Sequence, residues 1–379
     1  MYKYFTELVD FVGSRPKPFD NTKKYISTGA LKTNNISEDD IEMIDFATRP
    51  SRADLEVKNG DILFAKMAFT DKRLLVGEIE ADYIYSTGFF AVKPKEGIIT
   101  SKCLYFLLNS ESFRNQKDIN STGATQKAIT IEGLKKISLR IPEYHRQNQI
   151  GKTLENIDEI IKLKKQQLKE YDQLIKSRFV EMFGDIFNGK SNYSTIKISE
   201  AVVPKIERAK KDFNADDEIK YLDISSVDNR KNIIIGYTDY LMKDAPSRAQ
   251  QHVRKDDIVI STVRPNLNNV AKVTHDYSNI VASSGFCVLR ASKVEPNFLF
   301  ALVSMQSFAD YLASLTTGAN YPAVSDKDIL NFEIPNAPFE EQTKFSDFIK
   351  QVDKLKFVVQ QSLDETQKLF DSLMQKYFG

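Results

Sequence analysis

The sequence predicts a mixed α/β (α+β) fold: two similar globular domains, joined and separated by two long helices that pair as an antiparallel coiled coil about a pseudo-two-fold axis. Three observations predict it. Short segments recur in the same order about 195 residues apart, each half mixes strand-like runs with short helices, and each half ends in a long heptad pattern. A chain of 379 residues is long enough for two or three ordinary domains.

The internal repeat is the strongest of these observations. Single short matches arise by chance, but a series in the same order over nearly the whole chain indicates duplication of one unit. The two globular domains are therefore expected at 1–142 and 185–335, and the two long helices at 143–184 and 336–379. The matched segments are Tyr25–Ser27 with Tyr221–Asp223, Pro50–Ala53 with Pro246–Ala249, Val57–Ile62 with Val253–Ile258, Ser86–Phe89 with Ser283–Phe286, Ser112–Phe113 with Ser307–Phe308, Thr122–Ala124 with Thr317–Ala319, and Phe183–Gly184 with Phe378–Gly379.

Each globular domain is expected to place its strands first and its helices last. Short β-rich runs follow polar turns, helical stretches come after them, and an x-Pro break precedes each long helix. The expected strands include Ile62–Ala65, Phe89–Val92, Ile258–Ile260 and Phe286–Leu289, and the expected helices are Leu104–Phe113 and Asn297–Phe308.

Each half of the chain ends in one long amphipathic stretch. From Gln147 to about Met182 apolar residues alternate at spacings of four and three, the pattern of a coiled-coil seam. The second half repeats it, with polar residues in the seams at Lys164, Lys356 and Thr366. Packing of each helix on its own domain is the simpler alternative, but two matched seams favour antiparallel pairing and a spacer about 54 Å long. Extra apolar residues would leave surface for a partner helix at Ile160, Leu163, Leu355 and Val358.

Composition limits where the chain acts and what it contacts. Lys and Arg number 53 and Asp and Glu number 52, so any contact with DNA must come from local basic patches. No apolar run approaches the roughly 18 residues that span a bilayer, and no signal-peptide core is visible. The two cysteines, Cys103 and Cys287, show no C-x-x-C spacing. A cytoplasmic protein without a membrane partner is expected.

Two motifs resemble catalytic sites without their usual context. Residues 184–191 fit GxxxxGK[ST], which needs a strand before the loop and a helix after it, whereas the order here is the reverse. Glu56-Val57-Lys58 resembles the tail of a nuclease metal site, with Asp54 or Asp45 upstream, but the second half has His252-Val253-Arg254 there. We therefore expect no catalytic residue and no metal site, and keep a stand-alone nuclease or NTPase using Glu56 and Lys58 or 184–191 as the alternative.

Matched polar loops are the candidates for reading DNA. In the loop after Ile258–Ile260, Arg264 suits guanine, and Asn266 and Asn268 suit adenine. The corresponding loop of the first half is basic but differently composed, as two domains that read different sequences would need; a solvated hairpin is the alternative. The candidate DNA-contacting residues are Arg52, Lys66, Thr70, Lys72, Arg73, Thr125, Gln126, Lys127, Arg248, Arg264, Asn266, Asn268, Asn320 and Tyr321.

The sequence resembles the specificity subunits of Type I restriction-modification systems, over essentially its whole length. The resemblance rests on the repeat and on its motifs, namely Tyr25–Gly29 and Tyr221–Ser226, Asp257–Asn266, and Ile-Pro followed by Gln before each long helix (Ile141, Pro142, Gln147; Ile334, Pro335, Gln342). The low net charge and the lysines in the seams depart mildly from the family pattern.

The resemblance implies a role in phage defence. Two target-recognition domains would each bind one half of an asymmetric, bipartite site in double-stranded DNA. The paired helices would serve as a ruler and as the docking surface for two methyltransferase subunits, and restriction (translocase-nuclease) subunits could join. S-adenosylmethionine, ATP and Mg²⁺ would belong to those partners, with no cofactor in this chain. A purely structural coiled-coil scaffold is a third reading, against which the divergent basic loops weigh.

Overall fold

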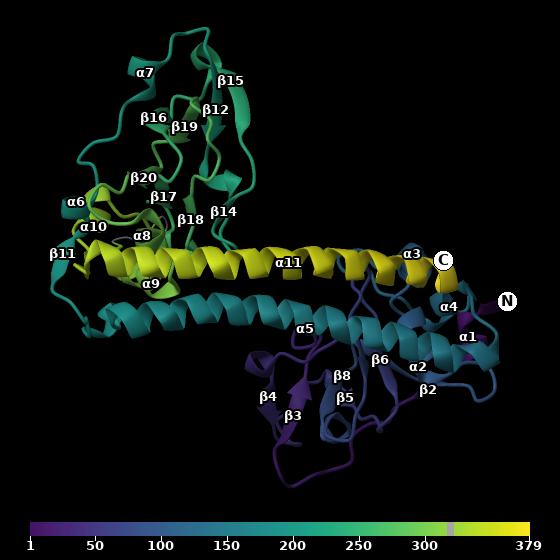
Figure 1. Cartoon of the computed structure of the whole chain (residues 1–379). Helices are drawn as coiled ribbons and strands as arrows, with labels where there is room; N and C mark the ends of the chain where they lie inside the picture. The colour runs from purple at the N-terminus through teal and green to yellow at the C-terminus, as the bar shows by residue number, and fades with distance from the viewer. Residues whose placement is uncertain (317–321) are drawn as a thin grey trace. The chain divides into compact units, whose positions relative to one another are not determined.

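The computed structural model describes residues 1–316 and 322–379, and the chain divides into two compact units (Figure 1). Unit 1 comprises Met1–Lys165 and Gln361–Gly379, and unit 2 comprises Gln166–Gln360. The two long helices, α5 (Tyr144–Phe183) and α11 (Phe339–Phe378), are each shared between the units. Within the described residues no helix has both the length and the apolar character needed to cross a membrane.

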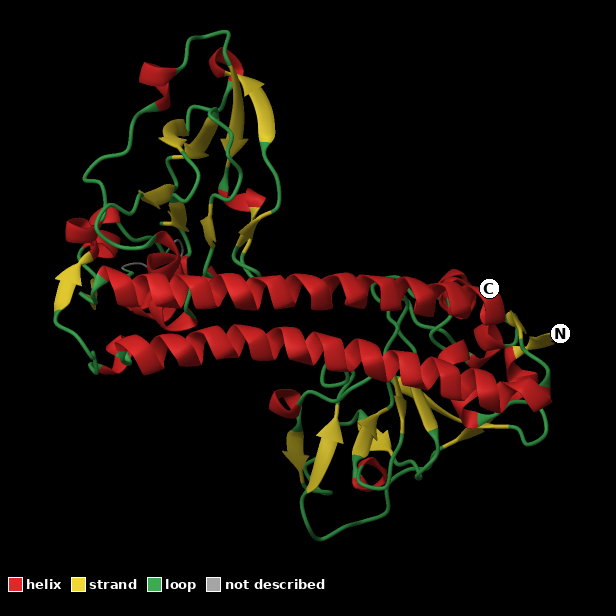
Figure 2. Ribbon diagram, viewed as in Figure 1, coloured by secondary structure: helices red, strands yellow, loops and turns green. Residues whose placement is uncertain are grey.

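Unit 1 contains two four-stranded sheets and one short strand pair (Figure 2). The first sheet has the order β2-β9-β6-β7 (Val9–Val12, Phe89–Pro94, Ile62–Ala65, Arg73–Leu75), the second has the order β4-β3-β8-β5 (Glu42–Ile44, Lys23–Ile26, Ile84–Ser86, Ala53–Leu55), and β1 (Tyr2–Tyr4) pairs with β10 (Ser138–Arg140). The helices are α1 (Phe5–Leu8), α2 (Ser101–Leu107), α3 (Glu111–Ile119) and α4 (Ile131–Leu134), with 3-10 turns η1 (Glu38–Asp40) and η2 (Glu80–Asp82).

Unit 2 repeats this plan with local differences. Its sheets have the orders β18-β17-β20 (Val270–Lys272, Ile258–Ser261, Phe286–Leu289) and β15-β12-β19-β16 (Thr238–Leu241, Glu218–Leu222, Ile280–Ser283, Ala249–Val253), and the short pairs are β11 (Thr195–Lys197) with β21 (Glu333–Pro335) and β13 (Val227–Asp228) with β14 (Ile233–Ile234). Its helices are α6 (Ile198–Ala201), α7 (Ala209–Asp212), α8 (Pro296–Val303), α9 (Gln306–Ser314) and α10 (Asp326–Leu330), with 3-10 turns η3 (Ile186–Asn188), η4 (Ile224–Ser226), η5 (Met242–Asp244) and η6 (Pro265–Leu267).

Strand register confirms the tandem repeat. In each unit one parallel pair lies among antiparallel ones, with Tyr25 opposite Ile84 in unit 1 and Tyr221 opposite Val281 in unit 2. A β-bulge follows the repeated Pro-Ser-Arg-Ala turn in both, directly after Ala53 and directly after Ala249. Bulges are specific features of a fold, so their coincidence at matched positions indicates one duplicated domain.

The central strand of unit 2 is buried on both faces because its side chains alternate. Ile258 and Ile260 belong to the cluster that includes Phe345 of α11, whereas Val259 belongs to the cluster formed with the second sheet. Successive side chains of a strand point to opposite faces, so a continuous apolar run is what such a position requires. Strand β6 of unit 1 is buried in the same way, over Ile62–Ala65.

The predicted helices Leu104–Phe113 and Asn297–Phe308 are wrong in one respect: each is two helices. In unit 1, α2 ends at Leu107 and α3 starts at Glu111, because the Ser110 side chain caps the second helix by accepting from the Phe113 N–H at 3.2 Å. A serine at an N-cap starts a new helix rather than continuing the old one. In unit 2 the break falls between Val303 and Gln306.

The two long helices run antiparallel within each unit, as predicted. In unit 1, Lys164 Nζ donates to Ser362 Oγ at 2.7 Å and to Thr366 Oγ1 at 2.7 Å, so polar positions of the two seams meet. In unit 2, Lys356 Nζ donates to Asp172 Oδ1 at 2.6 Å. Each helix spans 40 residues, or about 60 Å at ~1.5 Å per residue.

The helix ends pack on the globular parts as well as on each other. In unit 2, Phe179 of α5 stacks on Phe298 of α8 with ring centroids 5.5 Å apart, and Phe345 of α11 packs edge-on against Phe179 at 5.5 Å. Each of the two predicted packing arrangements therefore occurs in a different stretch. The helix ends pack on the globular domains and complete their cores, and the middle stretches pair with each other. Along the middle, Leu163, Leu355 and Val358 are exposed.

Candidate nucleic-acid interface

The two predicted DNA-reading loops of unit 1 lie together. Residues 66–72 follow β6, and residues 122–128 follow α3. Met67 forms a β-bridge with Ala128, and the Ala68 N–H donates to the Lys127 carbonyl at 3.0 Å. The Ile129 N–H also donates to the Lys66 carbonyl at 2.8 Å. Segments about 60 residues apart in sequence thus form one surface, held by backbone bonds that do not depend on the side chains presented.

Unit 2 makes the same junction. Val263 forms a β-bridge with Ala323, the Arg264 N–H donates to the Pro322 carbonyl at 2.8 Å, and the Val324 N–H donates to the Thr262 carbonyl at 2.9 Å. Two of the candidates, Asn320 and Tyr321, lie outside the described residues.

A third predicted segment adjoins this surface in both units. The carbonyl of Arg52 accepts from the Thr87 N–H at 2.9 Å, and Gly88 accepts from the Lys66 N–H at 2.9 Å. In unit 2, Arg248 accepts from Ser284 at 2.8 Å and Gly285 from Thr262 at 3.0 Å. The Arg-bearing turn, the Ser-x-Gly turn and the loop after the central strand are therefore consecutive neighbours in each unit.

The candidate side chains differ in how far they reach solvent. Seven are exposed: Arg52, Thr125, Gln126, Lys127, Arg248, Arg264 and Asn266. Four are half-buried: Lys66, Thr70, Lys72 and Asn268. The exposed set contains both cations for phosphates and groups able to hydrogen-bond base edges, which is the combination that sequence-specific DNA binding needs.

Arg73 is a correction, because it supports the loop from inside the domain. Its side chain is 2% exposed, Nη1 donates to Asn109 Oδ1 at 2.9 Å, and the guanidinium lies over the Tyr105 ring at 4.7 Å. Asn268 takes the matching place in unit 2, where Nδ2 donates to the Ser304 carbonyl at 2.9 Å. Both residues anchor the end of the loop to the junction of two helices, so neither is available to read bases in this arrangement.

Two lysines of unit 1 are partly engaged by the protein. Lys66 Nζ lies 4.5 Å from the centroid of the Phe90 ring, and Lys72 Nζ donates to the Thr28 carbonyl at 2.5 Å. Burial lowers the pKa of both ammonium groups from the ordinary value for lysine. The ring contact of Lys66 and the hydrogen bond of Lys72 hold the two side chains against their own domain.

A family model described as the Type I restriction modification DNA specificity domain matches this chain twice, over residues 14–171 and 192–365. The chain belongs to this family. It is 22% identical over 310 residues to the MjaVIII specificity subunit of Methanocaldococcus jannaschii, covering 77% of this chain and 72% of the relative. Members of the family are the DNA specificity subunits of Type I restriction-modification systems, so the resemblance inferred from the sequence is confirmed.

Two solved structures share the fold of this specificity subunit. One comes from work on complex assembly and conformational transition of the type I R-M system; it has a TM-score of 0.58 and 18% identity, covering 100% of this chain and 97% of its own. The other is a Type I S subunit from M. genitalium, with a TM-score of 0.55 and 14% identity, covering 100% and 96%. At these identities the likeness concerns the fold.

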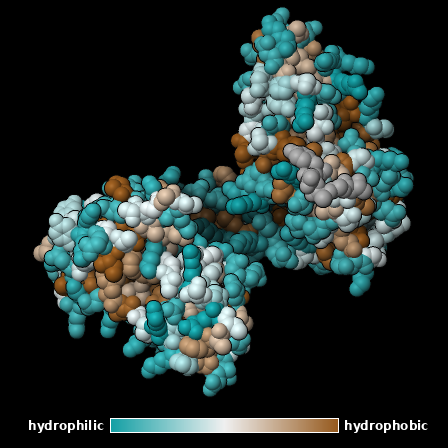
Figure 3. All heavy atoms as spheres, turned by 180° about the vertical axis from the view of Figure 1, so that it is seen from behind, coloured by the Kyte–Doolittle hydropathy of each residue, from teal (hydrophilic) through white to brown (hydrophobic). Residues whose placement is uncertain are grey.

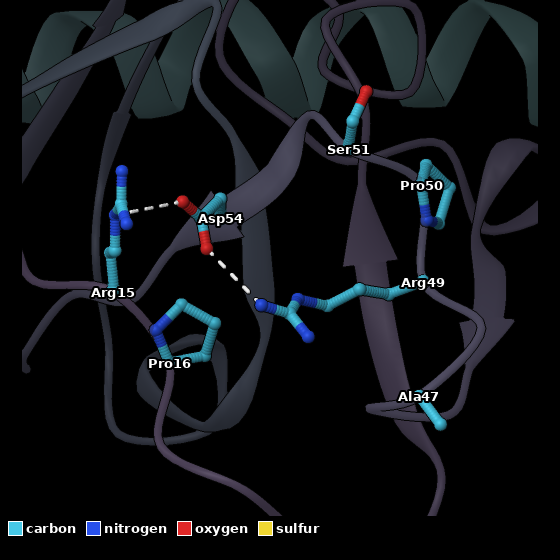
Figure 4. Close-up of a pocket in the computed structure, with 7 residues that line it drawn as sticks. All are labelled: Arg15, Pro16, Ala47, Arg49, Pro50, Ser51 and Asp54. Atoms are coloured by element: carbon cyan, nitrogen blue, oxygen red, sulfur yellow. Dashed lines mark hydrogen bonds and ion pairs between the residues drawn. The ribbon is translucent and has the colours of Figure 1, made fainter.

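The nuclease-like motif of the specificity subunit lacks the arrangement of a metal site. Asp54 lies in an open pocket of about 380 Å³ between two arginines, 3.2 Å from Arg15 Nε and 3.3 Å from Arg49 Nη2 (Figure 4). A carboxylate held by two guanidinium groups is neutralised and poorly placed to ligate a cation. Within residues 1–316 and 322–379, no group of three His, Cys, Asp or Glu side chains could hold a metal ion.

The phosphate-loop-like motif has the wrong surroundings too. Helix α5 precedes residues 184–191 and strand β11 follows them, the reverse of the order that cradles phosphate. Gly184 has φ +89°, and a Cβ there would collide with the Lys190 carbonyl and the Asn192 amide. Gly184 therefore ends helix α5 and lets the backbone of residues 190–192 approach closely, as the repeat indicates.

Two residues at this surface of the specificity subunit were not predicted from the sequence. Lys117 lies in α3 with only 3% of its side chain exposed, and its ammonium donates to carbonyls of the first loop. Phe69, at the tip of that loop, is the most exposed phenylalanine among the described residues. Lys117 could have been found from its place four residues after Phe113, on the apolar face of a helix. Phe69 could have been found as an aromatic residue within a basic loop.

Proposed function

We propose that this specificity subunit reads an asymmetric, bipartite site in double-stranded DNA. Target-recognition domain 1 (1–142) and target-recognition domain 2 (185–335) would each contact one half. The observation that carries the proposal is the matched surface of the two units: three segments joined by equivalent backbone hydrogen bonds, with different side chains on them. One fold that presents two polar patterns suits two different half-sites.

The residues proposed to touch DNA are the candidates of these surfaces other than Arg73 and Asn268, and two of them, Asn320 and Tyr321, lie outside the described residues. In domain 1 they are Arg52, Lys66, Thr70, Lys72, Thr125, Gln126 and Lys127, and in domain 2 they are Arg248, Arg264, Asn266, Asn320 and Tyr321. Cations on such a surface bind phosphates without regard to sequence, whereas Arg264 and the amides discriminate bases.

The long helices, 143–184 and 336–379, are proposed to act as the ruler between half-sites and to dock two methyltransferase subunits. Support comes from their exposed apolar side chains, with Ile160, Leu163, Leu355 and Val358 between 43% and 61% exposed. On the face shown in Figure 3, hydrophilic atoms predominate and apolar atoms gather in separate patches. Ile160 and Leu163, and likewise Leu355 and Val358, are neighbours at a spacing of three on their helices, and exposed apolar residues that adjoin one another are typical of a surface that a partner covers.

The chemistry is proposed to belong to the partners. The methyltransferase subunits would hold S-adenosylmethionine, and restriction subunits would use ATP and Mg²⁺, with no cofactor in this chain. The isolated chain should then neither methylate nor cleave DNA when S-adenosylmethionine, ATP and Mg²⁺ are supplied. ATP hydrolysis that disappears in Lys190→Ala would instead support the NTPase alternative.

Methylome sequencing of cells that express this chain with its methyltransferase tests the proposal. The expected result is one motif of two short specified segments separated by unspecified bases. A continuous motif, or methylation that is the same without this chain, would contradict it.

A further inference from the structure

The tip of the first loop in unit 1 combines two unfavourable features. Phe69 is 79% exposed, and its backbone has φ +58°. A bulky residue in the left-handed region is a conformational outlier, and a large aromatic side chain in water gains nothing from burial. Such local strain persists only where the surrounding structure enforces it, and it gathers at functional positions.

The surrounding structure enforces this tip from below. The buried Lys117 ammonium donates to the Met67 carbonyl at 3.0 Å and to the Thr70 carbonyl at 2.6 Å, on either side of the tip. Asp118 Oδ1 accepts from the Phe69 N–H at 2.8 Å. Hydrogen bonds thus hold the loop at Met67, Phe69 and Thr70. Because the loop is already ordered, little conformational entropy is lost when the ring binds.

Exposed apolar and basic residues belong to the segments that adjoin the tip. Ile119, the residue after Asp118, is 80% exposed. Lys66 begins the same loop, and the backbone carbonyl of Lys127, on the neighbouring loop, accepts from the Ala68 N–H next to Phe69. An exposed aromatic ring on a fixed loop that also carries lysines suits duplex DNA as a partner. The lysines can contact the phosphates, and the ring can contact the stacked bases, which are apolar on their faces.

We propose that Phe69, with Ile119 beside it, inserts as a wedge between neighbouring base pairs of the half-site bound by domain 1. Apolar side chains that enter a base step unstack it and kink the duplex, which brings more protein surface onto the DNA. Domain 1 would then select its half-site partly through the ease of unstacking one step, in addition to contacts with base edges. This inference rests on the proposed DNA-reading function.

Unit 2 carries a weaker version of the same feature. Leu267 in its loop and Leu315 after α9 are each 42% exposed. They are smaller, less exposed and not aromatic, so the distortion should be greater in the half-site of domain 1. That asymmetry is a specific consequence of the wedge.

The test uses the full chain assembled with its methyltransferase subunits and duplexes that carry the mapped motif. Adenine analogue 2-aminopurine, whose fluorescence rises on unstacking, is placed in turn along each half-site. The variants are Phe69→Ala and Phe69→Gly, which remove the ring, and Phe69→Trp, which keeps an aromatic. Gly accepts a positive φ without strain, so agreement between Ala and Gly assigns any loss to the ring and not to the backbone. Ile79→Ala, at another exposed apolar residue of unit 1, is the matched control.

The wild-type complex should give a fluorescence rise at one step of the domain 1 half-site. Phe69→Ala and Phe69→Gly should lose this rise and bind the motif about tenfold or more weakly, as expected for the loss of one aromatic stacking contact. Phe69→Trp and Ile79→Ala should retain both properties. Unchanged fluorescence and affinity in Phe69→Ala would overturn the wedge.

Two other outcomes are also decisive. If Phe69→Ala failed to assemble with methyltransferase, as judged by size-exclusion chromatography, the ring would contact protein and the wedge would be wrong. If the wild-type complex failed to distinguish the motif from random DNA, the proposed function itself would fail. If the wild-type complex preferred the motif to random DNA but gave no rise in aminopurine fluorescence, the wedge would be wrong and the proposed function would stand.

Discussion

Replacing Lys117 by Met should separate support of the recognition loop from support of the fold. The Lys117 ammonium is buried and donates to the Met67 and Thr70 carbonyls. Methionine occupies a similar volume and keeps the apolar contacts of the lysine stem. The substitution therefore removes the charge and two hydrogen bonds while leaving the packing of α3 largely intact.

The net effect on stability should be moderate because two terms oppose each other. Each hydrogen bond from a charged donor contributes about 1.5–3 kcal/mol, so about 3–6 kcal/mol is lost. Removing the ammonium also removes its desolvation penalty, which is several kcal/mol for a buried ion. The free energy of unfolding should fall by about 1–3 kcal/mol, the usual range for a single substitution. The two released carbonyls would then turn to water, and the loop would lose its fixed shape.

Urea unfolding measures the change in stability, and binding to half-site variants measures the loss of the loop's fixed shape. Lys117→Met should bind the domain 1 half-site poorly while its choice at the domain 2 half-site stays unchanged. Lys135→Met, at an exposed lysine of the same unit, is the matched control and should alter neither property. A Lys117→Met protein that folds and reads both half-sites like the wild type would refute the assignment of Lys117 as the support of the loop.

The stability difference should also depend on pH. Burial lowers the pKa of Lys117 below its ordinary value of 10.5, so in alkaline solution the unfolded chain binds more protons than the folded one. Stability then rises with pH between the folded and unfolded pKa values. The stability of the wild type relative to Lys117→Met should therefore rise with pH within that window and stay independent of pH below it.

Further predictions concern the helices, the loops and the thiols. Leu363→Asp puts a charge into the buried seam, so it should cost several kcal/mol in urea unfolding or abolish recognition of the spaced motif; full stability and specificity would contradict the paired seam. Arg264→Ala should relax one base position of one half-site at a cost of about 1–3 kcal/mol, seen in competition binding. Lys127→Ala should weaken binding to every sequence alike and reduce the salt slope by about one unit. Burial raises the pKa of the Cys103 thiol to about 12 and raises that of Cys287 as well, so a thiol reagent at pH 8 should modify neither residue until guanidinium unfolds the chain.

Features that repeat in the sequence were the ones it predicted well. The Pro-Ser-Arg-Ala turn, the apolar run of the central strand and the helix-ending Gly184 each recur about 195 residues away, and repetition separates a structural signal from chance. The heptad pattern likewise predicted antiparallel pairing, even though Lys164 interrupts it. The structure explains that interruption, because the lysine meets Ser362 and Thr366 of the partner helix.

Features set by tertiary environment were missed. Arg73 and Lys72 are neighbours in one basic loop, and sequence alone gives no reason to separate them. The strand register turns Arg73 inward onto Asn109 and Tyr105, whereas Lys72 stays half-exposed. Lys117 shows the same limit, because a lysine on a helix is ordinarily solvated and is buried here only because loop carbonyls satisfy its ammonium. The break between α2 and α3 depended on one capping serine within an otherwise helical stretch.

The central claim is that each domain reads its own half of the site. Methylation-motif mapping tests it on the wild type and on a chimera in which residues 195–335 come from a related specificity subunit. The account predicts a bipartite motif in which only one half changes between the two proteins. A chimera that altered both halves, or a wild type with one continuous motif, would contradict it.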